Sequence, residues 1–260
     1  MNSKSNTITA LNELGRFLSQ FSRKSVSEDN SVLFNDLFFN GFQHQIKISM
    51  EHNGWFSKEN LLFAIENWSI LLNTDSLTKW TSNYNFENLT QKNVAIIMAG
   101  NIPLVGFHDF LCALICNHNI IVKQSSNDKH LLPFFLHYLI KLAPELKNRV
   151  TFLEGNLKEF DAVIATGSDN TARYFEYYFK HKPSIIRKNR NSIAILTGQE
   201  SKDDLFQLSN DIFQYYGLGC RSVSKLFVPK NYNFDALFKA IYHWHPIIEG
   251  AKYANNYDYN

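Results

Sequence analysis

One cysteine of the chain stands in a sequence context that suits a nucleophile. Cys220 follows Gly217-Leu218-Gly219, and glycines on both sides of Leu218 allow the backbone to approach a ligand closely. Such a segment presents a thiol on a turn and keeps it out of a packed core. A cysteine in apolar sequence is more often an inert core residue, and this is our interpretation of Cys112 and Cys116. We therefore expect Cys220 to be the reactive thiol.

Three short apolar runs are each followed by small or hydrogen-bonding residues. In an open parallel sheet, ligands collect beyond the carboxyl ends of the strands, so these segments are candidate binding residues. They are Gly100 to Pro103 after residues 94–98, Lys123 to Ser126 after residues 120–122, and Thr166 to Asp169 after residues 162–165.

The roles of Asn101 and Ser168 stay open at this point. A helix that starts after Gly167 and Ser168 offers free N–H groups and the positive end of its dipole to a phosphate, but Ser168 also suits an ordinary helix N-cap. Asn101 also suits a turn in which its side chain bonds its own backbone. The sequence has no G-x-G-x-x-G segment, and this absence would normally argue against a Rossmann-type dinucleotide site.

These residues need a scaffold of alternating strands and helices. From residue 94 onward, short runs rich in β-branched residues alternate with longer helical patterns, which predicts an α/β fold with a buried parallel sheet. The first ninety residues are polar and helical, and begin with an amphipathic helix that carries Ile8, Leu11, Leu14, Leu18 and Phe21 on one face. The expected strands are 94–98, 120–122, 150–153, 162–165 and 193–196, and the expected helices are 106–116, 129–142, 170–179 and 203–216.

The composition excludes several classes of protein. The 260 residues are 45% hydrophobic and 19% charged, which is enough to bury a sizeable core. A net charge of +2 gives no broad field for nucleic acid, and no apolar run approaches the roughly 20 residues of a membrane span. Three cysteines without disulfide or metal-ligand spacing, and a start that lacks a signal-peptide pattern, favour a cytoplasmic protein without a metal.

Four segments resemble the LuxC-type long-chain fatty acyl-CoA reductases, a branch of the aldehyde dehydrogenase superfamily. They are GNIPLVGFHDFL, FDAVIATGSDNTARYFEYYF, IRKNRNSIAIL and YYGLGCRSVSKLFVP, and the resemblance extends over residues 90–255. It implies a helical N-terminal segment at 1–90 that packs on a dinucleotide-binding Rossmann-type domain at 91–212. Residues 213–260 would begin a catalytic α/β domain, which we expect to be truncated because the chain ends 40 residues after Cys220.

The resemblance also assigns roles to the candidate residues. It makes Cys220 the acyl-carrying nucleophile and Asn101, in the Asn-x-Pro loop with Pro103, a donor to the oxyanion. Lys123 would contact the adenosine ribose, with Ser125 and Ser126 beside it, and Gly167-Ser168 would lie at the cofactor-binding helix. This superfamily binds its cofactor without the G-x-G-x-x-G fingerprint.

Two departures from ordinary aldehyde dehydrogenases are informative. Where the superfamily has its general-base glutamate in Glu-Leu-Gly-Gly, this chain has Arg187-Lys188-Asn189-Arg190, so no base is supplied there and reduction is favoured over hydrolysis. The basic segment is either a solvated turn or a patch for the phosphates of coenzyme A. Ser126 replaces the glutamate that bonds the ribose 2′-hydroxyl in many NAD-using relatives, which admits NADPH, with Lys123 and Lys129 as charge partners.

The resemblance implies that Cys220 takes the acyl group from a coenzyme A thioester and that NADPH reduces it to the aldehyde. The donor would be fatty acyl-CoA or an acyl donor protein. The expected partners are a second copy of the chain in a homo-oligomer, an acyl-transferase and an acyl-protein synthetase. The rival interpretations are a short-chain or phosphate-activated acyl reductase with the same cysteine chemistry, and a nucleotide-binding protein without turnover.

Overall fold

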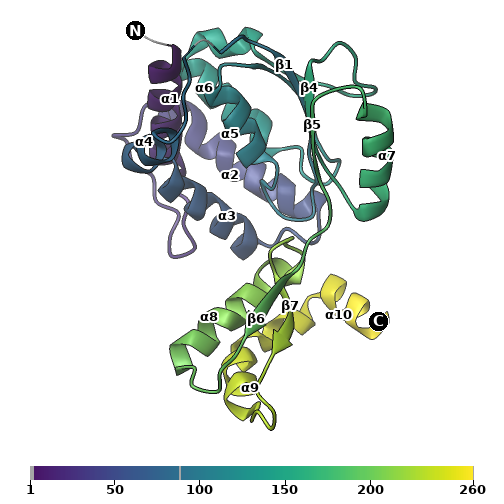
Figure 1. The fold of residues 1–260 in the computed structure, drawn as a ribbon. Helices are drawn as coiled ribbons and strands as arrows, with labels where there is room; N and C mark the ends of the chain where they lie inside the picture. Colours follow the sequence, from purple (N-terminus) through teal and green to yellow (C-terminus); the bar gives the residue numbers. More distant parts are fainter. Residues whose placement is uncertain (1–2, 88, 260) are drawn as a thin grey trace. The chain divides into compact units, whose positions relative to one another are not determined.

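The chain is divided into two compact units, Met1–Lys188 and Asn189–Asn260. The computed structural model, drawn in Figure 1, describes residues 3–87 and 89–259. Each unit has its own sheet and its own buried cluster. The boundary between residues 212 and 213 that the sequence suggested stays a prediction.

A parallel sheet forms the centre of the first unit, which confirms the predicted α/β class. Its five strands run in the order β3-β2-β1-β4-β5, so the chain moves outward from β1 in one direction and then returns to the other side of β1. The first four strands agree with the β-branched runs of the sequence. The strand β5 was not predicted, because it is a short edge strand of four residues that ends in a charged residue. The bounds are β1 Asn93–Ile97, β2 Asn119–Lys123, β3 Val150–Phe152, β4 Ala162–Thr166 and β5 Ser184–Arg187.

Helices cover both faces of this sheet (Figure 1). Successive residues of a strand point to opposite faces. Val94 and Ile96 of β1 join the large buried cluster on the face of α5 and α6, whereas Ala95 belongs to the cluster that Phe175 and Phe179 of α7 cover on the other face. The connecting helices are α5 Phe107–Ile115, α6 Leu131–Leu142, the 3₁₀ helix η1 Pro144–Asn148 and α7 Asp169–Phe179.

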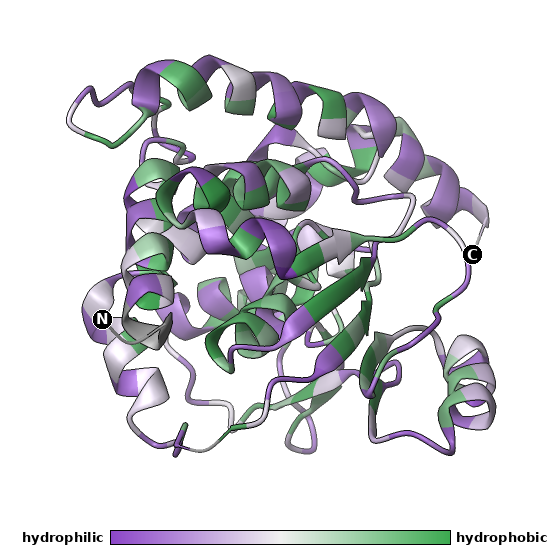
Figure 2. Ribbon diagram, turned by 90° about the horizontal axis from the view of Figure 1, so that it is seen from above, coloured by the Kyte–Doolittle hydropathy of each residue, from purple (hydrophilic) through white to green (hydrophobic). Residues whose placement is uncertain are grey.

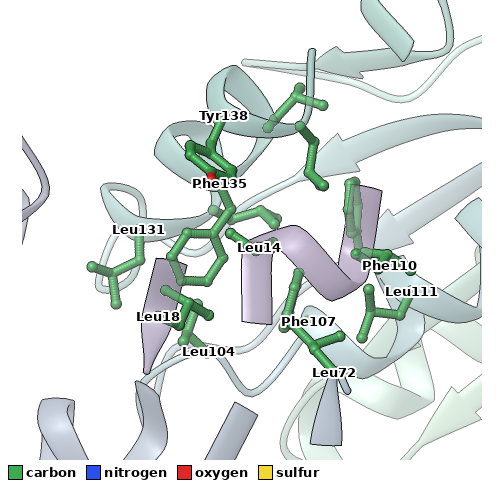
Figure 3. Close-up of a cluster of buried hydrophobic side chains, with 14 of the residues drawn as sticks. Leu14, Leu18, Leu72, Leu104, Phe107, Phe110, Leu111, Leu131, Phe135 and Tyr138 are labelled. Atoms are coloured by element: carbon green, nitrogen blue, oxygen red, sulfur yellow. The ribbon is translucent and has the colours of Figure 1, made fainter. Parts of the chain in front are cut away.

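The N-terminal helices add a second layer over α5 and α6. Leu11, Leu14 and Leu18 are fully buried, which confirms the predicted amphipathic helix, although the helix ends at Leu18 and Phe21 is buried in the segment after it. Figure 3 shows Leu14 and Leu18 of α1 among side chains of α5 and α6, including Phe107 and Phe135. The bounds are α1 Ser3–Leu18, α2 Asn35–His52, α3 Lys58–Leu71 and α4 Thr74–Thr81.

The second unit is built on a two-stranded parallel sheet. Strand β6 pairs with β7, and a small cluster of Leu196, Leu205, Leu208 and Leu237 packs beside them. Helix α8 starts at a capping box between Ser201 and Asp204, and it is shorter than predicted because the chain turns into a 3₁₀ helix after Phe213. The bounds are β6 Ser192–Ile195, α8 Lys202–Phe213, η2 Gln214–Gly217, β7 Val223–Phe227, α9 Asp235–Ile241, η3 Tyr242–Glu249 and α10 Ala251–Tyr259.

The hydropathy pattern follows this architecture. In Figure 2 the strands are largely hydrophobic, whereas the helices alternate between hydrophilic and hydrophobic residues along their length. Strands that are covered on both faces need apolar side chains in succession, and a helix at the surface needs only one apolar stripe.

Candidate active site

The three binding segments expected from the sequence share one edge of the first sheet. Ile97 at the end of β1 pairs with Lys123 at the end of β2 and with Ala165 near the end of β4. Because the strands are parallel, the residues after them emerge on the same side. The structure therefore brings together the segments that contain Asn101, Ser125–Ser126 and Gly167–Ser168.

Two of these segments touch directly. The backbone at Gly100 lies so close to Ser125 that a Cβ atom on Gly100 would be 2.5 Å from the Ser125 Oγ and 2.7 Å from its Cβ. Only glycine fits at that distance. We call residues 100–104 the Asn101 turn and residues 124–128 the Ser126 loop.

Asn101 is exposed in the Asn101 turn, whereas the last residues of the turn, Pro103 and Leu104, are buried. Leu104 has a φ of 59°, the left-handed region that a leucine seldom adopts, and its N–H donates to Asp128 Oδ2 at 2.7 Å. Burial raises the pKa of the Asp128 carboxyl to about 6, although the hydrogen bond from Leu104 acts in the opposite direction.

The Ser126 loop is fixed by helix α2 as well. Ser126 is exposed, and its carbonyl oxygen accepts a hydrogen bond from His52 Nε2 at 2.6 Å. Asn53 Nδ2 donates to the carbonyl oxygen of Asn127 at 3.3 Å. Lys123, at the start of the loop, is half-buried and its Nζ donates to the carbonyl oxygen of Gly155 at 2.7 Å, in the segment after β3.

The third segment begins helix α7. Ser168 is the N-cap residue, and its Oγ accepts the N–H of Thr171 at 3.3 Å. The backbone of Gly167 lies close to the first turns of α7, where a Cβ would be 3.0 Å from Thr171 and 3.2 Å from Phe175. Ser168 is thus a serine N-cap at the start of a helix whose first turn lies at the carboxyl edge of the sheet, so the two interpretations of Ser168 are compatible.

The basic segment that begins with the last residue of β5 is engaged in ion pairs. Arg187 donates to the Asp109 carboxylate from Nε at 3.2 Å and from Nη2 at 2.8 Å, and Lys188 Nζ lies 2.6 Å from Glu176 Oε1. Burial opposes the ionisation of Asp109, but the hydrogen bonds from His108 and Arg187 outweigh it and lower the pKa of Asp109. Arg187 and Lys188 are therefore not simply solvated.

Cys220 lies in the second unit on an exposed turn. The N–H of Ser222 donates to the carbonyl oxygen of Gly219 at 3.0 Å, which closes a turn with Cys220 and Arg221 at its centre. Before it, Tyr215, Tyr216 and Gly217 all have positive φ angles, of 56°, 59° and 71°. Two tyrosines in this region are costly, at roughly 1–3 kcal/mol each, and such strain gathers at functional sites.

The other two cysteines differ from the expectation of a closed core. Cys112 in α5 and Cys116 at the C-cap of that helix are both half-buried, whereas most of the other residues of α5 are buried. Cys112 Sγ lies 3.7 Å from Nδ1 of the exposed His108. Asp109, and then Cys112, raise the pKa of His108 to about 9. Cys220 is nevertheless the exposed thiol of the three.

Several of these contacts were not found from the sequence. The sequence patterns do not predict roles for His52, Asn53, Asp128 and Asp109. The first two lie in the N-terminal helical region, whose pattern predicts only packing. Asp128 could have been found from the sequence, since it is a carboxylate in the polar stretch after a predicted strand. Asn101 belongs to the first unit and Cys220 to the second, so their joint action on one carbonyl group stays a prediction.

The comparisons with known proteins agree with this organisation. The sequence model of the acyl-CoA reductase (LuxC) family matches residues 8–236. The chain belongs to the LuxC acyl-CoA reductase family. This membership agrees with the resemblance seen in the four motifs. No curated protein matches the chain significantly.

Solved structures of aldehyde dehydrogenases share the fold of this LuxC family member. The aldehyde dehydrogenase KauB from Pseudomonas aeruginosa is 13% identical with a TM-score of 0.59, over 94% of this chain and 51% of that chain. A NAD-dependent benzaldehyde dehydrogenase from Corynebacterium glutamicum is 10% identical with a TM-score of 0.62, over 94% of this chain and 54% of that chain. An indole-3-acetaldehyde dehydrogenase in complex with NAD⁺ is 13% identical with a TM-score of 0.60, over 94% and 51%.

The chain thus spans about half the length of these aldehyde dehydrogenases. At this level of identity the similarity shows the fold. Among residues 3–87 and 89–259, no helix has the length and apolar character to cross a bilayer.

Proposed function

We propose that the chain is the acyl-accepting and dinucleotide-binding part of a reductase that converts fatty acyl-CoA to aldehyde with NADPH, through an acyl group on Cys220. The observation that carries this proposal is the exposed thiol of Cys220, on a turn that follows three residues with positive φ, in a member of an acyl-CoA reductase family. A strained, exposed turn suits a nucleophile and does not suit a structural cysteine.

In the proposed acyl transfer, the Cys220 thiolate attacks the thioester carbonyl. A carbon–sulfur bond forms to Cys220, the bond to the coenzyme A sulfur breaks, and coenzyme A leaves as a thiolate that takes up a proton. The Asn101 side chain and a backbone N–H would donate to the oxyanion that develops between these steps. Asn101 is exposed at the binding edge of the sheet, as a donor to a bound substrate must be.

The cofactor site is proposed at the carboxyl edge of the first sheet. Lys123, Ser125 and Ser126 would hold the adenosine end, and the start of α7 after Gly167 would hold the phosphates. The helix N-terminus at Ser168 suits a phosphate, which free backbone N–H groups would bind there. The cofactor, when bound, supplies the hydride that reduces the acyl group.

The choice of NADPH over NADH rests on Ser126. A serine at this place leaves the 2′-phosphate unopposed by a carboxylate, and the exposed Lys129 follows in the same segment. The imidazole of His52 lies beside the same loop through its bond to the Ser126 carbonyl oxygen. Lys129 would thus place a positive charge close to the proposed 2′-phosphate site.

The residues around Arg187 support reduction over hydrolysis. The carboxylate nearest to Arg187 is Asp109, whose pKa is lowered and whose oxygens both accept hydrogen bonds from the guanidinium. A carboxylate in this state is a weak base toward water. An acyl group on Cys220 would therefore persist until hydride arrives.

Mass spectrometry after incubation with a long-chain acyl-CoA tests the proposal. We expect one acyl adduct per chain, linked as a thioester at Cys220, with free coenzyme A released in equal amount. Acylation precedes hydride transfer, so a chain that spans half of its structural relatives still reports on the first half-reaction. Preference for acetyl-CoA or an acyl phosphate would favour the rival substrate classes, and absence of any adduct together with NADPH binding would favour a nucleotide-binding protein without turnover.

The physiological acyl donor and the partners are part of the same proposal. The donor would be fatty acyl-CoA or an acylated donor protein, delivered to a homo-oligomer that works with an acyl-transferase and an acyl-protein synthetase. Sizing the chain alone and with an acylated donor tests these associations.

A further inference from the structure

The two loops that the proposed function uses are joined by one carboxylate. Asp128 closes the Ser126 loop, and its Oδ2 accepts the N–H of Leu104 at the end of the Asn101 turn, at 2.7 Å. Close packing joins the same two loops at their other ends, where Gly100 meets Ser125. Asn101 lies in the sequence between Gly100 and Leu104, the residues that make these two attachments.

The Asp128 contact holds the turn in a conformation that leucine resists. Leu104 is buried and has a positive φ, so its N–H points in a direction that an ordinary extended or helical residue would not give it. The bond to Asp128 compensates for that conformation. Loss of this acceptor would let Leu104 relax, and the turn that carries Asn101 would move with it.

The Ser126 loop is itself held from within and from helix α2. Ser125 Oγ accepts the N–H of Asn127 at 3.2 Å, Gln124 Nε2 donates to the Asp128 carbonyl oxygen at 3.3 Å, and His52 Nε2 donates to the Ser126 carbonyl oxygen at 2.6 Å. A loop with this many attachments moves as one piece. A ligand that rests on Ser125 and Ser126 therefore acts on Asp128 as well.

We propose that Asp128 is a positioning residue that fixes the Asn101 turn to the Ser126 loop, so that a dinucleotide on the Ser126 loop orders the Asn101 amide for acyl transfer. The inference rests on the proposed roles of Asn101, Ser126 and Cys220. It adds a link between cofactor binding and acylation, and couplings between two binding sites commonly amount to 5–150-fold in equilibrium affinity.

Hydrogen exchange on the 260-residue chain tests the link directly. Wild type, Asp128→Ala and Asp128→Asn are compared with and without NADPH, and exchange is followed in peptides that cover residues 99–106. We expect Asp128→Ala to speed exchange of the Leu104 amide by roughly tenfold or more, and NADPH to slow exchange of the turn in wild type but not in Asp128→Ala. Asp128→Asn keeps an acceptor oxygen, so it should retain part of the protection. Equal exchange in wild type and Asp128→Ala, or an equal NADPH effect in both, would overturn the proposal.

The acylation rate of Cys220 gives the second readout. NADPH should accelerate acylation of wild type by about fivefold or more, should change that of Asp128→Ala by less than about twofold, and should give Asp128→Asn an intermediate response. Acylation that responds to NADPH equally in all three chains contradicts the link. A wild type that shows the exchange coupling but is never acylated contradicts the proposed function and leaves the coupling supported.

The pH dependence of Leu104 amide exchange separates a positioning role of Asp128 from a simple loss of structure. It needs only wild type and Asp128→Asn, so it remains available if Asp128→Ala does not fold. Burial raises the pKa of the Asp128 carboxyl to about 6, and a neutral acid accepts a weaker hydrogen bond than a carboxylate. Leu104 protection in wild type should therefore exceed that in Asp128→Asn above pH 6 and fall to the same level below it. The charged groups of the surrounding elements, Lys129, His130 and His52, are unchanged between the two chains. A constant ratio across this range would contradict the positioning role of the carboxylate.

Discussion

Arg187 and Asp109 form a bidentate ion pair, with Nε 3.2 Å from Oδ2 and Nη2 2.8 Å from Oδ1. The arginine ends strand β5, at the place where the superfamily resemblance has a general-base glutamate, and the aspartate lies in the first turn of α5. Two parallel hydrogen bonds fix the guanidinium plane against the carboxylate. Under the proposed correspondence, the place of the superfamily's glutamate therefore carries a cation that is paired with Asp109.

Replacing Asp109 should change the titration of its neighbour His108. The raised pKa of His108, about 9, comes first from Asp109 and then from Cys112. In Asp109→Asn the pKa of His108 should fall toward its ordinary value near 6.5. An NMR titration of the His108 ring in both chains measures this shift, with Cys112→Ser as the matched control that removes the smaller contribution.

The interaction between His108 and Asp109 also makes the stability of the protein depend on pH. A histidine whose folded-state pKa is raised contributes stability that is fully present below about pH 6.5 and is lost as the pH rises through about 9. The free energy of unfolding of wild type, relative to Asp109→Asn, should therefore decline between these values. Urea unfolding at pH 6, 7.5 and 9 checks the trend. A constant difference in the free energy of unfolding would show that Asp109 does not raise the pKa of His108.

Cys220→Ser should abolish thioester-linked acylation. Cys112→Ser and Cys116→Ser should retain it, because these two thiols are half-buried and Cys220 is exposed. Peptide mapping of the acyl label in the three variants decides the matter. Label on Cys112 deserves the closest inspection, since His108 lies 3.7 Å from its sulfur. Acyl groups that persist in Cys220→Ser would contradict the proposed mechanism.

The acyl-enzyme should be long-lived in water when no reductant is present. In the proposed correspondence with the superfamily, Arg187 takes the place of the general base, and general-base catalysis contributes roughly 10²- to 10⁴-fold to such a hydrolysis. Single-turnover release of fatty acid from isolated acylated chain measures the lifetime, and hydroxylamine treatment provides the positive control for thioester cleavage. Rapid spontaneous release would mean that another residue activates water.

NADPH should bind more tightly than NADH, by an order of magnitude or more, if one charge-assisted hydrogen bond to the 2′-phosphate contributes about 1.5–3 kcal/mol. Ser126→Glu should reverse the preference, because its carboxylate would repel the phosphate and accept a bond from the ribose hydroxyl of NADH. Titration of both cofactors against both chains gives the two ratios. Ser82→Glu is a suitable control, since it adds the same charge at an exposed site after α4.

Gly100→Ala should destabilise the first unit by about 1–3 kcal/mol, because the new Cβ would lie 2.5 Å from the Ser125 Oγ. Ser125→Gly in the same chain removes the atoms it would strike, so the double variant should recover a large part of the loss. Denaturant unfolding of the two single variants and the double variant completes the cycle. Additive effects would show that the two residues do not touch.

The sequence alone predicted most of the first sheet and the candidate residues of the site. The runs at 94–98, 120–122, 150–153 and 162–165 predicted four of the five strands of the first unit, because β-branched residues in short runs suit a buried sheet wherever the chain places it. The glycines around Leu218 also marked Cys220 as different from Cys112. Each of these signals lies within a few residues of the feature that it predicts.

Tertiary structure alone decided the contacts that hold the site. His52 bonds to Ser126, Leu104 to Asp128 and Arg187 to Asp109, and these partners are 74, 24 and 78 positions apart. Local patterns carry no information on such pairs, because the pairs form only when the strand order β3-β2-β1-β4-β5 brings the strand ends together. The edge strand β5 was not predicted for the same reason, since these four residues, which end in Arg187, form a strand only by pairing with β4. The sequence thus determined which residues have the chemistry, and packing of the helices on the sheet determined which of them meet.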